Sequence, residues 1–141
     1  MLTNKYARGS EWRKWDLHIY TPKSIIQKYG GDTPEIWEKF IADLENLPDD
    51  FKAIGINDYI FLEGYKEVLK YKQKGRLANI DLILPIVELR VDKFCSLGDE
   101  AWKKVNLHLI FSDQLKVEEI EAQFLNAIQH CIKISPDIEG I

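Results

Sequence analysis

Cysteine is scarce in this sequence and widely spaced. Cys95 and Cys131 are the two cysteines among 141 residues, and they form no C-x-x-C pair. This spacing argues against a disulfide framework and against a thiolate zinc site. Buried or incidental thiols are the simpler interpretation, so the cysteines give no indication of function.

Long hydrophobic runs are also missing. The longest apolar stretch, residues 80–89, is interrupted by Asp81, Pro85 and Glu88, whereas a membrane span needs roughly 20 apolar residues. The start of the chain, MLTNKYARGSEWRKW, contains no apolar core of the signal-peptide type. We therefore expect a soluble protein of the cytoplasm with no membrane partner.

An excess of positive charge is absent as well. The chain has 19 Lys and Arg against 23 Asp and Glu, for a net charge of -4. No global positive field is available to hold a nucleic-acid backbone, so any phosphate must be bound locally. Hydrophobic residues make up 45% of the chain, which is enough for one packed domain over residues 1–141 and excludes collagen-like and disordered classes.

Strand-like and helix-like patterns alternate along the chain. This order favours an α/β architecture with at least partly parallel strands. Thr33 and Pro34 are a helix start signal. Continuous apolar residues favour a central strand at 82–89, although Pro85 argues against one because proline cannot donate to a ladder. The predicted strands are 14–20, 51–56, 82–89 and 105–111, and the predicted helices are 34–47, 62–74 and 117–134.

Polar residues with ligand chemistry lie on these strands. His18, Asp58 and Glu88 are at or near the carboxyl ends of three strands, and His108 is on the polar face of a fourth. In parallel α/β folds the loops converge at that end of the sheet. Two imidazoles and two carboxylates there would suit zinc, manganese or iron. Such a metal polarises a phosphoryl oxygen and supplies a bound hydroxide near neutral pH.

Each of these residues also has a simpler interpretation. A histidine on a strand, such as His108, is more often part of a hydrogen-bonded structure than a metal ligand. Asp58 could cap the next element, and Glu88 could be half of an ion pair with Arg90. His130 lies away from the apolar stripe of the third helix, which indicates a solvated side chain.

Four segments together resemble the polymerase and histidinol phosphatase (PHP) family. The first motif of that family, D-L-H-x-H-T-x-x-S, resembles WRKWDLHIYTPKS, and the second, a strand ending in T-D-H, resembles FKAIGINDYIFLEGY. The third, a strand ending in a metal-binding Glu, is similar to LILPIVELRVD, and the fourth, a strand carrying a histidine, to VNLHLIF. The four segments follow the family's order over about residues 11–111. The residue patterns of these segments most resemble those of PHP-like domains that lie N-terminal to SMC-like or ABC-type ATPases. Some of those proteins belong to bacterial phage-defence systems.

This resemblance implies a distorted α/β barrel with parallel-biased strands and a metal cluster at its carboxyl rim. Members of the family hydrolyse phosphomonoesters or the phosphodiesters of nucleic acids. By position, the resemblance implies His18, Glu88 and His108 as metal ligands. It implies Asp16 and Asp58 as groups that orient those ligands.

Three cations lie close to the motif strands. Arg13, Lys14 and Arg90 are candidates for neutralising the charge of a bound phosphate. Ordinary solvated surface is the alternative interpretation of all three.

The sequence departs from the family at two ligand positions and in length. Tyr20 stands where the second histidine of H-x-H belongs, and Tyr59 stands where the histidine of D-H belongs. A phenol with a pKa of about 10 is a poor ligand at neutral pH. A complete barrel would need roughly 60 to 130 more residues. We therefore expect a partial PHP-type (β/α) barrel, an N-terminal fragment of a longer one, with one divalent metal ion or none.

Two functions follow from these observations. The first is a metal-dependent phosphoesterase in which a hydroxide on the metal attacks phosphorus, although we expect the isolated chain to be inactive. The second is a non-catalytic scaffold that docks an ATPase domain, with Tyr20 and Tyr59 as packing and hydrogen-bonding groups. A half-barrel also leaves unpaired strand edges, through which two copies could associate.

Overall fold

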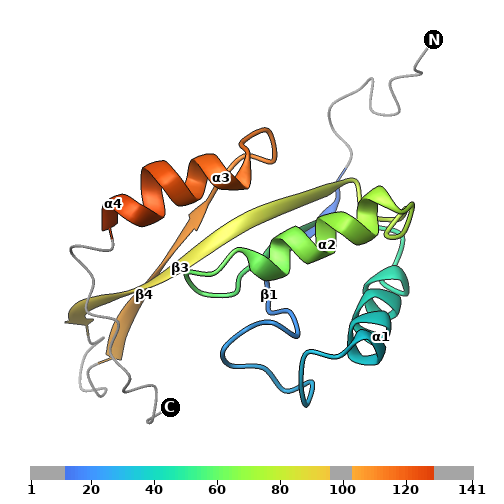
Figure 1. Cartoon of the computed structure of the whole chain (residues 1–141), viewed down its shortest axis with the longest axis horizontal. Helices are drawn as coiled ribbons and strands as arrows, with labels where there is room; N and C mark the ends of the chain where they lie inside the picture. The colour runs from blue at the N-terminus through green and yellow to red at the C-terminus, as the bar shows by residue number, and fades with distance from the viewer. Residues whose placement is uncertain (1–11, 96–102, 129–141) are drawn as a thin grey trace.

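A computed structural model describes residues 12–95 and 103–128, which form a four-stranded sheet with helices against it (Figure 1). The strands are β1 (Lys14–Ile19), β2 (Phe51–Ile56), β3 (Leu82–Cys95) and β4 (Lys103–Ile110). The helices are α1 (Pro34–Glu45), α2 (Glu63–Gln73) and a final helix made of α3 (Val117–Glu119), η1 (Ile120–Leu125) and α4 (Asn126–Ile128). The α/β class and the three main helical segments are therefore confirmed.

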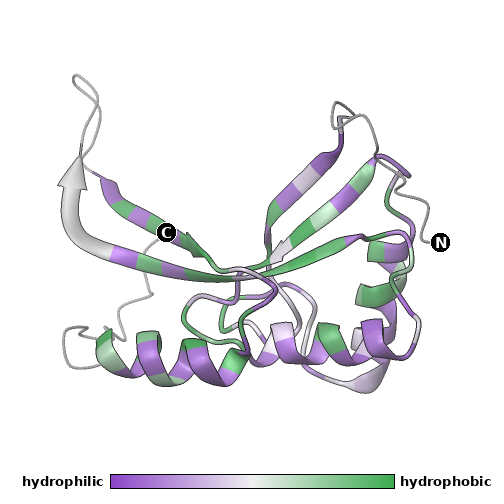
Figure 2. Cartoon of the chain, turned by 90° about the horizontal axis from the view of Figure 1, so that it is seen from above, coloured by the Kyte–Doolittle hydropathy of each residue, from purple (hydrophilic) through white to green (hydrophobic). Residues whose placement is uncertain are grey.

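The sheet is mixed, with the strand order β1-β2-β3-β4. The β1–β2 and β2–β3 pairs are parallel, as expected, whereas β3 and β4 form an antiparallel pair. The described helices lie on one side of the sheet, and the β3–β4 pair splays away from β1 and β2 on the other side (Figure 2). The described part of the chain is thus a curled half-barrel.

Pro85 lies at the point where β3 changes its partner. The ladder between β2 and β3 ends with Ile56 opposite Pro85, and the ladder between β3 and β4 begins with Ile86 opposite Ile110. The missing N–H of proline therefore falls at a junction between two ladders instead of within one. The Pro85 carbonyl still accepts a hydrogen bond, from the Phe111 N–H at 3.0 Å. This junction explains how a central strand accommodates a proline.

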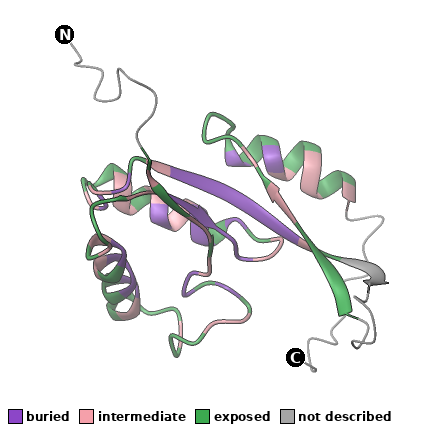
Figure 3. Cartoon of the chain, turned by 180° about the vertical axis from the view of Figure 1, so that it is seen from behind, coloured by how far each residue is buried: buried purple, intermediate pink, exposed green. Residues whose placement is uncertain are grey.

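The main core lies between the sheet and the helices. Thr33 is extended before α1 and Pro34 occupies its first turn, as the sequence predicts. The buried stripe of α1 consists of Trp37, Phe40, Ile41 and Leu44. These side chains pack in one cluster with Ile54 and Ile56 of β2 and with residues of α2 and β3. Much of β3 is buried, whereas the beginning of β4 is exposed (Figure 3).

Three local features differ from the sequence-based expectations. β3 continues to Cys95, beyond the predicted end at residue 89, because β4 pairs with its second half. The last helix contains a π-helical segment, and residues 129–134 of the predicted helix lie outside the described residues. Trp15, on the predicted apolar face of β1, is 56% exposed, whereas Ile19 on the same strand packs against the core.

Helix length and composition bear on membrane insertion. Within residues 12–95 and 103–128, no helix combines the length and the apolar character that crossing a bilayer requires.

Candidate functional site

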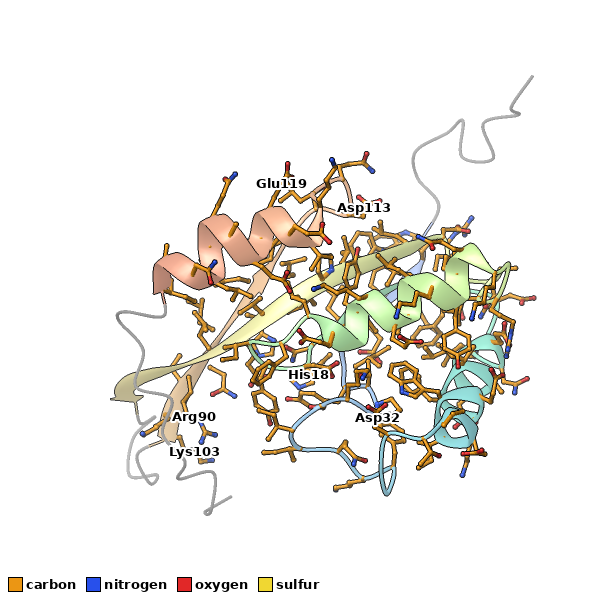
Figure 4. All side chains as sticks on the ribbon, in the orientation of Figure 1. His18, Asp32, Arg90, Lys103, Asp113 and Glu119 are labelled. Carbon is orange, nitrogen blue, oxygen red and sulfur yellow. The ribbon has the colours of Figure 1, made fainter. Side chains whose placement is uncertain are left out.

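The three predicted ligands come from three strands and lie on the side of the sheet opposite the described helices, since their strand neighbours Ile19, Val87 and Leu109 belong to the core that packs against those helices. Glu88 of β3 is directly opposite His108 of β4, so their side chains share one face of the antiparallel pair. His18 is at the carboxyl end of β1, where the β1–β2 register shifts between Asp16 and Ile19. Figure 4 labels His18 below β3, near the middle of the molecule.

The two histidines and the glutamate are close neighbours but do not contact one another through hydrogen bonds. The ring centroids of His18 and His108 are 5.0 Å apart. The His108 Nε2 atom is 3.8 Å from Glu88 Oε1, which is longer than a hydrogen bond. The structure therefore brings together the three side chains that the sequence selects.

Tyr20 fills the space between His18 and Glu88. Its hydroxyl lies 2.9 Å from His18 Nε2 and donates a hydrogen bond to Glu88 Oε2, also at 2.9 Å. Burial, together with the neighbouring Tyr59 side chain and the Glu88 carboxylate, raises the pKa of Tyr20 above its ordinary value. The phenol therefore keeps its proton at neutral pH and serves as a donor.

Two asparagines hold the Glu88 carboxylate. Asn57 Nδ2 donates to Oε2 at 2.9 Å, and Asn106 Nδ2 donates to Oε1 at 2.7 Å. Glu88 is 5% exposed, so these donors replace the water that a carboxylate needs. Our sequence reasoning gave neither asparagine a role. The signal for Asn106 was its spacing of two residues from His108, which places both on one face of β4.

Tyr59, at the second departure from the family pattern, shapes the turn after β2. It has a positive φ of 60° and its ring stacks on Tyr20, with the ring centroids 5.3 Å apart. Its carbonyl accepts a hydrogen bond from the Glu88 N–H at 2.8 Å. The backbone of this turn therefore fixes Glu88, while the ring of Tyr59 supports the ring of Tyr20.

The two predicted orienting carboxylates accept hydrogen bonds from backbone N–H groups and from the Thr21 hydroxyl instead of from imidazoles. Asp16 Oδ1 accepts the backbone N–H of His18 at 3.0 Å. Asp58 accepts the Thr21 N–H and the Thr21 hydroxyl, at 2.8 and 2.6 Å. Both carboxylates thus position the chain around the site, and neither has a described hydrogen bond to the His18 or His108 ring.

The three predicted phosphate-binding cations lie in different places. Arg90 is directly opposite Asn106 in the β3–β4 ladder, and its Nε is 3.4 Å from Asn106 Oδ1. Lys14 is at the beginning of β1, and its Nζ is 2.7 Å from Asp50. Arg13 contacts the carbonyl of Trp12. Of the three, Arg90 is linked through Asn106 to the carboxylate of the site.

The side chains do not form a metal site as they stand. Among the described residues, no group of three or more His, Cys, Asp and Glu side chains is arranged so that it could hold a metal ion. The Tyr20 hydroxyl is bonded to the very atoms, His18 Nε2 and Glu88 Oε2, that a shared ion would need. A metal could use these residues only if this hydrogen-bond pattern changed.

Comparison with known proteins adds no assignment. No family model, no curated protein and no solved structure matches this chain.

Proposed function

We propose that this chain is a PHP-like domain related to metal-dependent phosphoesterases, with a degenerate metal site. The observation that supports the proposal is the convergence of His18, Glu88 and His108 from three strands, with the imidazole centroids 5.0 Å apart. Imidazole and carboxylate ligands suit zinc, manganese or iron. The residual site takes at most one such ion, and the isolated chain does not turn over phosphate esters.

The experiment is elemental analysis of the purified chain after reconstitution with each of the three metals. We expect up to one equivalent in the wild type and its loss in His18→Ala and in His108→Ala. His130→Ala is the matched control, because it makes the same substitution at the remaining histidine, and it should keep the metal. Absence of metal in the wild type after every reconstitution would sink the proposed metal site.

A chromogenic phosphodiester then tests the catalytic part of the proposal. We expect no turnover above that of His18→Ala under conditions in which the wild type holds its ion. Turnover that disappears in both histidine variants would show that the site is an active phosphoesterase.

A non-catalytic scaffold is the second candidate, and the Tyr20 hydrogen bonds favour it. They satisfy His18 and Glu88 without a metal ion. In this function the domain docks an ATPase domain in the cytoplasm, or a second copy along an edge strand of the described sheet, β1 or β4. Nucleic acid is the less favoured partner, because the net charge is -4. Sedimentation of the chain alone at increasing concentration tests the homo-oligomer.

A further inference from the structure

The Tyr20 hydroxyl contacts two potential metal ligands at once. It lies 2.9 Å from His18 Nε2 and 2.9 Å from Glu88 Oε2. A phenol has one hydrogen to donate and two lone pairs with which to accept. The direction of each hydrogen bond therefore decides which atom of His18 carries a proton.

The surroundings of Glu88 settle the direction of one bond. Its carboxylate accepts hydrogen bonds from three groups: the Tyr20 hydroxyl at 2.9 Å, the Asn57 amide at 2.9 Å and the Asn106 amide at 2.7 Å. An amide N–H can only donate, and the third bond runs from the Tyr20 hydroxyl to Glu88 Oε2. The single hydrogen of Tyr20 is therefore used in the bond to Glu88.

The bond between Tyr20 and His18 must then run the other way. The phenol oxygen has only lone pairs left for this bond, so His18 Nε2 donates its N–H to Tyr20. A neutral imidazole with its proton on Nε2 has its free lone pair on Nδ1. A metal ligand needs a deprotonated nitrogen, so Nε2 of His18 is not available while this bond exists.

We infer that Tyr20 is a positioning residue that keeps a metal ion from binding His18 Nε2. Its hydroxyl holds His18 as the Nε2–H tautomer and links that ring to Glu88 through hydrogen bonds. The inference rests on the proposed metal site. Binding through His18 Nε2 requires that the hydrogen bond to Tyr20 break and that the proton move to Nδ1. Removal of the hydroxyl should therefore make His18 Nε2 available to a metal ion.

Tyr20→Phe is the direct test, because it deletes the hydroxyl and keeps the ring. That ring stacks on Tyr59 and packs edge-on against His18, with centroids 5.3 and 5.0 Å away. Loss of one competing hydrogen bond should tighten metal binding about tenfold. Mn²⁺ is the probe, since it prefers nitrogen and oxygen ligands to the thiols of the two cysteines.

The measurement is an electron paramagnetic resonance titration of free Mn²⁺ against the full chain. We expect tighter binding in Tyr20→Phe than in the wild type, and loss of that gain in Tyr20→Phe/His108→Ala. Tyr71→Phe is the matched control, because Tyr71 stacks on Trp37 in the helical layer, and it should bind as the wild type does. If the wild type binds Mn²⁺ and Tyr20→Phe binds it no more tightly, the inference fails and the metal site stands. If neither protein binds the ion, the proposed metal site fails, and the inference fails with it.

Nitrogen-15 spectra of the histidine rings give a second readout that needs no metal and no variant. We expect His18 of the wild type to be the Nε2–H tautomer. The assignment comes from His18→Ala, in which the His18 signals disappear. An Nδ1–H tautomer for His18 would overturn the inference even if Tyr20→Phe failed to fold.

Discussion

Thr21 donates one hydrogen bond to each carboxylate oxygen of Asp58. Its N–H reaches Oδ1 at 2.8 Å and its hydroxyl reaches Oδ2 at 2.6 Å. Asp58 is 1% exposed, so Thr21 replaces water around the buried Asp58 carboxylate. The pair fixes the segment after β1 against the segment after β2, and thereby places Tyr20 beside Asn57 and Glu88.

Gly64 of α2 makes room for this pair, and we predict that Gly64→Ala destabilises the protein. A Cβ atom at this position would overlap Asp58 Oδ2 and the Thr21 hydroxyl oxygen. Alanine favours a helix over glycine by about 1 kcal/mol, but overpacking a filled site costs typically about 1–3 kcal/mol. We expect the overlap to prevail and the free energy of unfolding in urea to fall by up to about 2 kcal/mol.

The control for this prediction is Lys70→Ala, at an exposed position on the same helix. It should change the free energy of unfolding by no more than about 0.5 kcal/mol. A Gly64→Ala protein that is as stable as the wild type would contradict the tight packing around Asp58.

Asp58 should also make stability depend on pH. Burial raises the pKa of Asp58 above its ordinary value, although the hydrogen bonds from Thr21 oppose the shift. The folded protein then holds this proton to higher pH than the unfolded chain, whose Asp pKa is about 3.9. The contribution of Asp58 to stability is therefore fully present below that value and is lost as the pH rises through the folded pKa.

Asp58→Asn removes the titration and nearly keeps the shape. We expect the wild type to lose stability relative to this variant as the pH rises from acidic to neutral, in urea unfolding across a pH series. The exposed Asp49→Asn serves as the control, because it makes the same substitution at the surface. A difference between wild type and Asp58→Asn that is constant with pH, or that changes in the opposite direction, rules out a raised pKa.

The sequence predicts those features of the fold and of the site that depend on neighbouring residues or on a repeating pattern of apolar residues. Thr33 and Pro34 begin α1 as predicted, because capping and φ restriction act within one turn. Alternation with apolar neighbours places His108 on the polar face of its strand, and the continuous apolar run of residues 82–89 places Glu88 near the end of a central strand. Strand pairing then brings them opposite each other.

Features that depend on pairing between distant strands were not predictable. Nothing local to Pro85 indicates that β3 changes its partner at that residue, since the change depends on where β2 ends and β4 begins. Likewise, Asn57 and Asn106 become partners of Glu88 only once three strands are in register. The sequence identified Tyr20 as a departure from the family, but its bridge between two ligands required the structure.

We predict that Asn57→Ala destabilises the protein through Glu88. This change removes the amide that donates to Glu88 Oε2 at 2.9 Å, and the carboxylate is 5% exposed, so water replaces the donor poorly. A hydrogen bond to a charged group contributes about 1.5–3 kcal/mol, and we expect the free energy of unfolding to fall by that amount. In a Glu88→Gln background the same change should cost less, about 0.5–1.5 kcal/mol, because the acceptor is neutral. Equal costs in the two backgrounds would show that Asn57 acts independently of the Glu88 charge.

Gly55 of β2 lies against the side chain of Ile86 in β3, and we predict that the two positions are energetically coupled. A Cβ atom at Gly55 would overlap Ile86 Cδ1 and come within 3.0 Å of the Leu17 Cα atom. Gly55→Ala should therefore lower the free energy of unfolding by about 1–3 kcal/mol. Ile86→Val, which removes the overlapping methyl group, should cost about 0.5–1.5 kcal/mol alone.

The shorter side chain makes room for the new Cβ atom at position 55. The loss of unfolding free energy in the double variant should therefore be smaller than the sum of the two single losses by at least about 0.5 kcal/mol. Urea unfolding of all four proteins measures this coupling, and strictly additive losses would mean that Ile86 does not limit the space at Gly55.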